Sequence, residues 1–439
     1  MKRLVKKIIP EFTINFYHFA FAYLGALAYG FPSRKMIVIG VTGTKGKTST
    51  SNLIAEVLNK CGFKTGMAST VNFRIGDKEW INETKQTMLG RFKLQRLLRQ
   101  MSDAGCKYAV VETSSEGILQ HRHKFIDYKI AVFTNLSPEH IERHKGFENY
   151  RAAKLRLFKK IAQGGDEIAI VNLDDEHAEF FLDVPVARKY GYCIDCDEFG
   201  YRSAMMENKF RISNVELSVK GSKFVLNHAP FETSLLGKFN VYNVGAAICV
   251  ALSQNISMEK IQEAVLKARP IPGRMEVIDE GQNFTVIVDY SYESKSLESA
   301  LKTVKIFSPK RIFVLFGATG GGRDKWRRPV MGEIADKYAD IIFVTTDDPY
   351  DEKPKNITDA ILQGVLKNRK RKLKENVFEI VDRRQAIKKA IEMAQDGDVI
   401  LFAGKGGEKW MNLAKGKKIS WDEGEVVREE IKNNLAKNF

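Results

Sequence analysis

The sequence predicts an α/β protein in which a larger domain with a mainly parallel sheet is followed by a smaller α/β domain. From residue 36 onward, short apolar runs that suit buried strands alternate with helical patterns, and such alternation is typical of parallel sheets. A glycine-rich turn follows the first of these strands, at 40–50. The pattern stops at Pro270 to Arg274 and then starts again. We therefore expect a P-loop-type central domain over 36–270 and a Rossmann-like domain over 271–439.

Length and composition suit a multidomain enzyme with anionic ligands. The chain has 439 residues, a length greater than one hydrophobic core usually organises. Of these residues, 44% are hydrophobic, which is enough to build a large core. Its 70 Lys+Arg against 54 Asp+Glu give a net charge of +16, which favours nucleotides or phosphorylated metabolites as partners. We expect no nucleic-acid partner, because no aromatic residues interleave with the densest basic run, at 367–374. Five scattered cysteines indicate a reducing cytoplasm, with Cys193 and Cys196 as reduced thiols in a loop.

The first 35 residues predict an aromatic-rich helical segment. Residues 12–30 carry no Asp, Glu, Lys or Arg, and a basic stretch precedes them, so the segment resembles a signal or anchor sequence. The first strand of the sheet begins a few residues after Pro32, however, which leaves no room for a separate tether. We expect residues 12–30 to pack on the first domain of a cytoplasmic protein. Peripheral membrane contact through the same helix is the alternative.

The turn at 40–50 carries the most functional information, because it joins a strand at 36–41 to a helix. Backbone N–H groups of such a turn converge on an anion, and the helix N-terminus adds its positive dipole. Lys47 can neutralise phosphate charge, and Thr48 offers a hydroxyl to Mg²⁺. The common P-loop has a glycine five residues before Gly46, where this chain has Val41, and the turn glycine is instead Gly43. A nucleoside triphosphate is the expected ligand, held by Gly43, Thr44, Lys45, Gly46, Lys47, Thr48 and Ser49.

Two later segments follow strands of the same predicted sheet. Glu112 comes directly after the strand at 107–111, where the carboxyl end of a parallel strand faces the ligand crevice. Its carboxylate is therefore positioned to hold Mg²⁺ against the phosphates. After the strand at 130–134, His140 and His144 lie four residues apart. This spacing fits either a metal pair or two surface residues on one helical turn, and the sequence does not decide between them.

Taken together, these segments resemble the Mur ligase family of ATP-dependent carboxylate–amine ligases. Their order and spacing are most similar to the MurE branch, which adds the third residue of the peptidoglycan stem peptide. The resemblance runs from about residue 36 to the C-terminus. It rests on TGTKGKT at 42–48, ETSSEGILQHR at 112–122, TNLSPEHIERH at 134–144, YRAAKLRLF at 150–158, GKFNVYN at 237–243, PGRME at 272–276, FGATGGGRDKWRRP at 316–329 and AGKGGE at 403–408.

The resemblance implies a three-step reaction. ATP phosphorylates a substrate carboxylate, the acyl phosphate is held between the domains, and the amine of an incoming amino acid displaces phosphate to form an amide. In the family pattern Lys47 is catalytic, and Thr48 and Glu112 hold one Mg²⁺. A second Mg²⁺ is organised by Glu112, His140 and a carbamylated lysine, which here is Lys154. The plain alternative is an unmodified Lys154 that contacts phosphate directly.

The resemblance also implies the remaining ligand contacts. The adenine-side asparagines of the family match Asn240 and Asn243, and its ribose and phosphate contacts match Arg274 and Asp289. The expected partners are an amino acid, bound by the C-terminal domain, and a carboxylate acceptor, most simply a muropeptide. The acceptor contacts match Ser69, Thr70, Thr87, Ser114, Ser115 and Arg122, and the amino-acid contacts match Arg323, Asp348, Gly404 and Glu408.

The chain departs from the family pattern at positions that contact substrate. About 35 residues precede the central domain, where the family carries a uridine-binding domain, so the resemblance does not imply recognition of UDP. In the branch that uses meso-diaminopimelate, a D-N-P-R motif supplies an arginine for the distal carboxylate, and here Tyr350 follows Pro349. Diaminopimelate is therefore not the expected amino acid. Two alternatives stay open: a ligase for a lipid-linked, folate-like or poly-glutamate acceptor, and a nucleotide-binding subunit that needs a partner.

Overall fold

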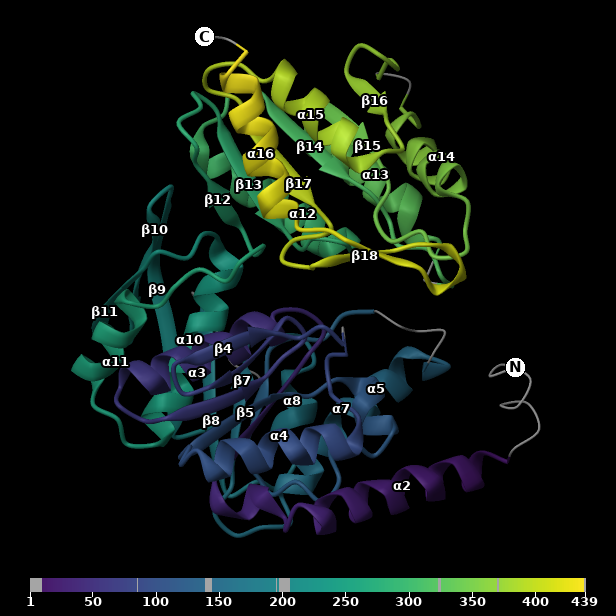
Figure 1. Cartoon of the computed structure of the whole chain (residues 1–439). Helices are drawn as coiled ribbons and strands as arrows, with labels where there is room; N and C mark the ends of the chain where they lie inside the picture. The colour runs from purple at the N-terminus through teal and green to yellow at the C-terminus, as the bar shows by residue number, and fades with distance from the viewer. Residues whose placement is uncertain are drawn as a thin grey trace. The chain divides into compact units, whose positions relative to one another are not determined.

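A computed structural model describes residues 10–84, 86–138, 144–194, 196, 206–322, 325–368 and 371–437. The chain divides into two compact units, and the main division falls between Arg269 and Pro270. The second unit also takes two short earlier pieces, Leu217–Gly221 and Leu235–Lys238. Each unit is built on its own sheet with helices packed on it (Figure 1).

The first unit contains an 11-stranded sheet with the order β11-β10-β9-β8-β7-β6-β1-β5-β2-β3-β4. In the middle of the sheet, the seven strands β9, β8, β7, β6, β1, β5 and β2 each run parallel to the next. The pairs β2–β3, β3–β4 and β10–β11 are antiparallel. The predicted mainly parallel sheet is confirmed. The strands are β1 Ile37–Thr42, β2 Thr65–Ala68, β3 Asn72–Ile75, β4 Lys78–Ile81, β5 Tyr108–Glu112, β6 Tyr128–Phe133, β7 Ile168–Asn172, β8 Arg188–Ile194, β9 Asn208–Ser218, β10 Gly221–Leu226 and β11 Ala229–Thr233.

The central strands are buried on both faces, because helices cover the sheet. Strands β5 and β7 are buried at every position, which explains their continuous apolar sequences. In α4, Leu94, Leu97, Leu98 and Met101 recur at helical spacing and face the core. The helices of this part of the chain are α2 Glu11–Ala28, η1 Pro32–Lys35, α3 Lys47–Lys60, α4 Arg91–Asp103, α5 Ser115–Leu119, α7 Phe147–Ile161, α8 Ala178–Leu182, α10 Lys238–Ser253 and α11 Met258–Leu266.

The second unit contains a six-stranded sheet with the order β12-β13-β17-β14-β15-β16. Only β12 runs antiparallel to its neighbour, so the smaller α/β fold expected after residue 270 is confirmed. Its strands are β12 Glu276–Ile278, β13 Thr285–Asp289, β14 Ile312–Phe316, β15 Ile341–Val344, β16 Val377–Glu379 and β17 Val399–Ala403, with a small ribbon of β18 Trp410–Asn412 and β19 Lys418–Ser420. Its helices are α12 Ser294–Val304, η2 Lys305–Phe307, α13 Arg327–Tyr338, α14 Pro354–Val365, α15 Arg383–Met393, η3 Ala414–Gly416 and α16 Glu423–Leu435.

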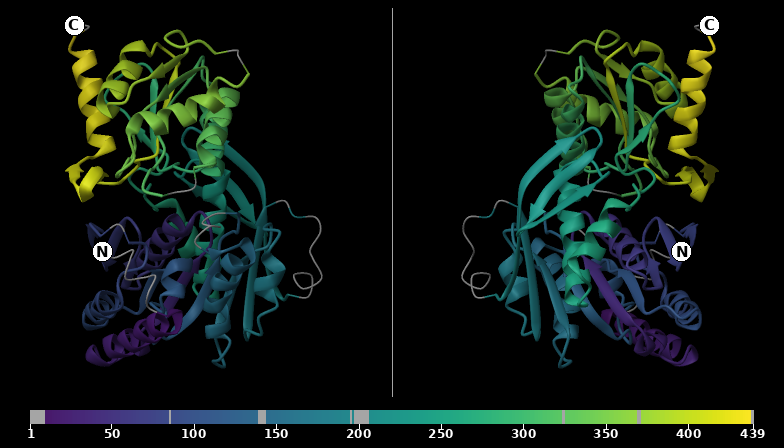
Figure 2. Two further views of the ribbon diagram at one scale, coloured as in Figure 1. Left: turned by 90° about the vertical axis from the view of Figure 1, so that its right-hand side faces the viewer. Right: turned by 90° about the vertical axis from the view of Figure 1, so that its left-hand side faces the viewer.

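Helix α2 runs along the outside of the first unit, as both views of Figure 2 show. Its main packing partner is α4, and Gly25 of α2 lies against the backbone of Arg91 and Phe92. Among the helices that the structure describes, none combines the length and the apolar character needed to cross a membrane.

The two cysteines of the C-x-x-C segment differ from the sequence-based expectation. Cys193 lies within β8 rather than in a loop, and it forms a disulfide with Cys196. The expectation of two reduced thiols is therefore wrong. The strand end brings the two Cα atoms to 5.9 Å, a separation that suits a disulfide.

Candidate active site

The glycine-rich turn between β1 and α3 has a backbone that requires glycine at two points. Gly43 has φ of 152°, and a Cβ there would lie 2.0 Å from Thr134 Oγ1. Gly46 has φ of 78° and precedes the first residue of α3. A Cβ on Gly46 would lie 2.6 Å from Asn243 Oδ1. The chain therefore turns sharply into α3 with no space for a side chain at either position.

Polar groups from the segment after β6 hold this turn in place. The Thr44 N–H donates to Asn135 O at 2.8 Å, and the Lys45 N–H donates to Asn135 Oδ1 at 2.9 Å. The Ser137 N–H donates to Thr44 Oγ1 at 3.0 Å, and Tyr150 Oη lies 3.1 Å from the same hydroxyl. Sequence reasoning considered this segment only for its histidines and missed Asn135 and Tyr150. Asn135 closely follows β6, a strand next to β1, whereas Tyr150 lies on α7, and the contacts of both depend on how these segments pack around the turn.

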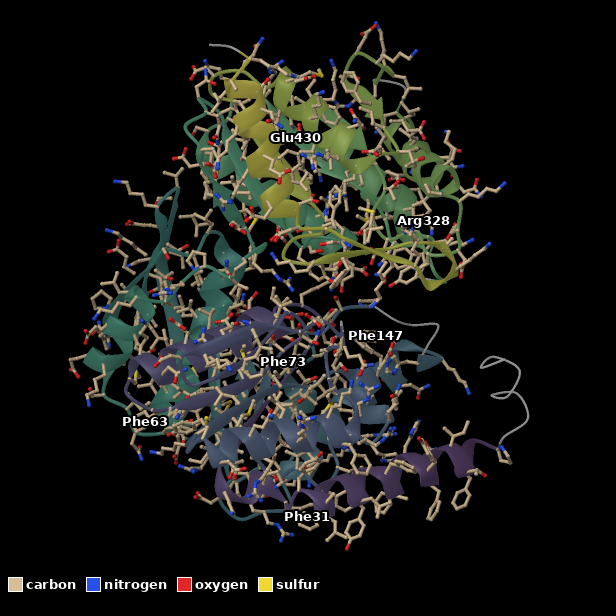
Figure 3. The ribbon with its side chains drawn as sticks, in the orientation of Figure 1. Phe31, Phe63, Phe73, Phe147, Arg328 and Glu430 are labelled. Atoms are coloured by element: carbon tan, nitrogen blue, oxygen red, sulfur yellow. A yellow bond between two sulfur atoms is a disulfide. The ribbon has the colours of Figure 1, made fainter. Side chains whose placement is uncertain are left out.

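Two lysines from different helices converge on the carbonyl groups of the turn. Lys47, at the start of α3, donates to Thr44 O at 2.8 Å. Lys154, on α7, donates to Gly43 O at 2.5 Å and is only 1% exposed. Its Nζ also lies 4.4 Å from the ring centroid of Tyr150. The helix that carries Lys154 begins at Phe147, which Figure 3 labels. Both ammonium groups therefore lie beside the predicted phosphate cradle.

Glu112 brings a buried carboxylate to the same place. The Thr48 hydroxyl lies 3.1 and 3.0 Å from the two carboxylate oxygens of Glu112. Glu112 is only 1% exposed. Thr70 donates to Glu112 Oε2 twice, from its N–H at 2.7 Å and from its hydroxyl at 2.9 Å. Adjacent ligands of an octahedral Mg²⁺, each at about 2.1 Å, lie about 3 Å apart. The oxygens of Thr48 and Glu112 therefore fit a shared Mg²⁺.

The two asparagines predicted to contact adenine, Asn240 and Asn243, lie on α10, and Asn243 contacts the first turn of α3. Asn243 Oδ1 accepts from Thr50 Oγ1 at 3.0 Å, and Asn243 Nδ2 donates to Asn240 Oδ1 at 3.0 Å. Both asparagines are buried on α10. Ser49 is buried in the first turn of α3, next to Thr48. The structure thus gathers the turn and α10 into one cluster, although their residues are about 200 positions apart in sequence.

The expected acceptor residues of the first unit make hydrogen bonds with neighbouring loops, and we call these residues the rim. Arg122 contacts Met88 O and donates to Gln86 Oε1 at 3.2 Å, so it lies beside the loop that carries Thr87. Burial lowers the pKa of the Arg122 guanidinium. Ser69 donates to Asn72 Oδ1 at 2.6 Å. These contacts order the rim, and the acceptor roles of its residues stay predictions.

Two serines after β5 are held by different partners. Ser114 is the N-cap of α5 and accepts from the Gly117 N–H at 3.1 Å. Ser115 Oγ lies 3.1 Å from His144 Nε2. His144 is only 4% exposed, so the surface alternative is wrong for this histidine. His140 lies outside the described residues, and the metal pair stays a prediction.

In the second unit, the carboxyl ends of β13, β15 and β17 bring the predicted residues together. Lys405 is fully buried, and its Nζ donates to Asp348 Oδ1 at 2.9 Å and to Glu408 Oε2 at 2.6 Å. Asp347 Oδ1 lies 3.6 Å from the same Nζ. Burial lowers the pKa of Lys405, but the three carboxylates outweigh it and the pKa is raised. The sequence analysis quoted the motif at 403–408 without recognising this lysine.

The remaining predicted residues of this unit lie around the same strand ends. Asp289 Oδ2 accepts from the Met275 N–H at 2.8 Å, and burial raises the pKa of the Asp289 carboxyl. Arg274 stacks over the ring of Tyr290, with 4.5 Å between the guanidinium carbon and the ring centroid. The backbone N–H of Gly404 donates to Asp289 O at 3.0 Å. Arg323 lies outside the described residues.

The turn with its lysines, the buried carboxylate and the threonine has the residue types expected of a phosphate site in a nucleotide-dependent α/β enzyme. The model described as Mur ligase middle domain matches residues 41–251, and the model described as Mur ligase, glutamate ligase domain matches residues 273–406. The chain belongs to the Mur ligase family, whose members are ATP-dependent ligases. The resemblance seen in the sequence is thereby confirmed.

Individual relatives extend over nearly the whole chain. A UDP-N-acetylmuramoyl-L-alanyl-D-glutamate–2,6-diaminopimelate ligase of Geobacillus kaustophilus is 36% identical over 97% of this chain and 84% of the relative. A UDP-N-acetylmuramyl-tripeptide synthetase of Roseiflexus is 34% identical over 96% of this chain and 84% of the relative. A solved diaminopimelate ligase structure superposes with a TM-score of 0.61 at 31% identity, covering 91% of this chain and 79% of that one. The folylpolyglutamate synthase of Mycobacterium tuberculosis shares the fold, with a TM-score of 0.67 at 14% identity, covering 95% of this chain and 94% of that one.

Proposed function

We propose that this ligase joins an amino acid to the carboxylate of a muropeptide. A carboxylate oxygen of the acceptor attacks the γ-phosphorus of ATP and ADP leaves. The amine of the amino acid then attacks the acyl carbon, loses a proton, and phosphate leaves as the amide forms. The observation that carries the proposal is the convergence of Lys47, Lys154, Thr48 and Glu112 on one turn. The printed names of the relatives support a muropeptide as the acceptor.

The residues around the turn fit the roles that the family pattern gives them. Lys47 would neutralise charge on the transferred phosphoryl group. Thr48 and Glu112 would hold one Mg²⁺, and Glu112, His140 and Lys154 a second. Bound Mg²⁺ would supply electrostatic stabilisation of the phosphate oxygens. Asn240 and Asn243 would contact the adenine, while Arg274 and Asp289 would contact the ribose and phosphate.

For Lys154, we propose that the working form is a carbamate. A protonated amine cannot ligate Mg²⁺, whereas a carbamate presents two anionic oxygens. Supporting this role, Lys154 is buried on α7 and its Nζ reaches the glycine-rich turn. The unmodified amine, which donates to Gly43 O, is the alternative that a rescue experiment distinguishes.

We also propose that the amino acid carries no second carboxylate. Tyr350 stands where an arginine would recognise the distal carboxylate of diaminopimelate, and a tyrosine hydroxyl supplies no charge. The ring of Tyr350 packs closely against Gly321, where an added Cβ would lie 2.8 Å from the ring. Asp347, Asp348 and Glu408 add negative charge to the nearby strand ends. These carboxylates would favour an amine over a carboxylate on the substrate side chain, and L-lysine is the first candidate to test.

The experiment is an ADP-release assay with purified protein, Mg²⁺ and ATP. Muropeptide acceptors with and without UDP are crossed with L-lysine, meso-diaminopimelate, L-glutamate and L-alanine, and the amide product is identified by mass spectrometry. We expect release that depends on both acceptor and amino acid. Release without amide formation, with every acceptor, would refute the ligase proposal. Equal or better turnover with diaminopimelate than with lysine would refute only the amino-acid part.

A further inference from the structure

Helix α2 leaves eight of its large apolar side chains at least 38% exposed. Ala22 and Ala26 are buried at 2% and 0% exposure, and Gly25 lies against α4. A surface helix normally buries its large apolar residues and exposes polar ones, so the arrangement is reversed here. The residues exposed by 38% to 80% are Phe12, Phe16, Tyr17, Phe19, Phe21, Tyr23, Leu24 and Leu27, which we call the aromatic face.

The aromatic face continues onto the elements packed beside α2. Phe19 and Tyr23 lie 5.1 and 5.3 Å from the ring of Phe125, and Phe21 lies 6.1 Å from Phe92 at the start of α4. Phe92 is itself 38% exposed. Figure 3 shows the labelled Phe31 just beyond the helix. A contiguous apolar surface of this kind marks a site of interaction rather than scattered exposed residues.

Basic residues accompany the aromatic face on the neighbouring elements. Arg34 and Lys35 of η1 are exposed, and so are Lys93 and Arg96 of α4. The acidic residues of α2, α4 and the loop before β6 are Glu11, Asp103 and Asp127; Asp103 pairs with Arg99 at 2.7 Å, and Asp127 pairs with Lys129 at 3.5 Å. The surroundings of the face are therefore positively charged.

We propose that α2 binds flat on the surface of an anionic lipid bilayer through the aromatic face. Phenylalanine and leucine side chains would enter the boundary of the acyl region, and tyrosine hydroxyls would remain at the level of the headgroups. The basic residues of η1 and α4 would attract the anionic headgroups. A flat orientation agrees with the finding that no described helix suits a membrane crossing.

The inner side of α2 connects to the loop expected to contact the acceptor. His18 contacts Arg91, which donates to Gln120 O at 3.1 and 2.8 Å. Gln120 Oε1 in turn accepts from Arg122 at 3.2 and 2.8 Å. Docking would therefore hold this loop close to the lipid surface. The consequence for the acceptor rests on the proposed function, whereas the lipid binding itself does not.

The test is flotation of the full chain with vesicles of phosphatidylcholine containing phosphatidylglycerol, compared with pure phosphatidylcholine. We expect stronger binding to the anionic vesicles and a loss of binding at high salt. The variant Phe12→Ser/Phe16→Ser/Leu27→Ser should weaken binding at least tenfold. The variant Arg34→Gln/Lys35→Gln should weaken it about fivefold for each charge removed and should reduce the salt dependence.

A matched control removes exposed apolar side chains elsewhere. Leu266, Val219 and Leu373 are 55%, 49% and 50% exposed, and their triple replacement by serine should leave vesicle binding unchanged. All variants should retain the wild-type melting temperature and ADP release. Absence of binding to anionic vesicles, or equal loss in the control, would overturn the proposal. If the wild-type chain binds no vesicles but sediments as a dimer, and the Phe12→Ser/Phe16→Ser/Leu27→Ser variant sediments as a monomer, the aromatic face would instead bind a second copy of the chain.

Discussion

Replacing Lys154 by alanine should nearly abolish amide formation, and a small carboxylate should restore part of it. The substitution removes a buried side chain that donates to Gly43 O at 2.5 Å. Loss of a hydrogen bond from a charged group costs about 1.5–3 kcal/mol, and truncation of a long buried side chain adds about 2 kcal/mol or more. We therefore expect a lower melting temperature. We also expect at least a thousandfold loss of kcat, because the proposed carbamate ligand of the second metal would be lost.

The assay for Lys154→Ala measures ADP release and amide product with increasing acetate or formate. Either anion can occupy the vacated space and present oxygens in place of the carbamate. Lys154→Arg should remain inactive in the same titration, since it keeps a positive charge. The control is Lys159→Ala, an exposed lysine on the same helix, which should show wild-type turnover. Wild-type activity of Lys154→Ala, or rescue by neither anion while the protein remains folded and binds ATP, would refute the carbamate.

Three further substitutions test the other parts of the site. Lys47→Ala should lower kcat by a factor of about 10² or more, because no other side chain replaces its charge at the transferring phosphoryl group, and near wild-type turnover of the folded variant would contradict the phosphate assignment. Gly43→Ala should weaken ATP binding in calorimetry, since its Cβ would lie 2.0 Å from Thr134 Oγ1; unchanged affinity would show that the turn is not the binding element. Tyr350→Arg should raise kcat/KM for meso-diaminopimelate about tenfold or more over wild type, with Tyr350→Phe as the control that gains nothing.

Much of the first unit could be predicted from sequence, because its signals are local. The strand ending at Val41, the two glycines and Lys47 follow one another within a dozen residues, and their chemistry depends on backbone shape. Glu112 could be placed as well, since a residue at the end of a parallel strand faces the ligand crevice. The contacts of Asn135 and Tyr150 with Thr44 could not, because they depend on how separate segments pack around the turn.

The orientation of α2 shows a different limit of sequence reasoning. The composition of residues 12–30 indicated an apolar helix, and small residues were visible at 22, 25 and 26. Hydrophobicity alone favours burial of the phenylalanines, yet the buried positions of α2 are taken by the small residues Ala22, Gly25 and Ala26, and Gly25 lies against α4. The large rings are therefore left outside, an outcome set by the shape of the packing surface rather than by the hydrophobic pattern.

The cluster around Lys405 is best explained by function, because its charges are costly for folding alone. The fully buried ammonium group of Lys405 faces Asp347, Asp348 and Glu408, and the buried guanidinium of Arg383, which pairs with Glu423, also attracts the two aspartates. Burial of each ion carries a desolvation penalty of several kcal/mol, and an apolar core of the same volume would often be at least as stable. Positions that violate the ordinary rules of burial are expected at functional sites. The cost of burying these charges therefore marks the strand ends around Lys405 as the place where the proposed amino-acid substrate would bind.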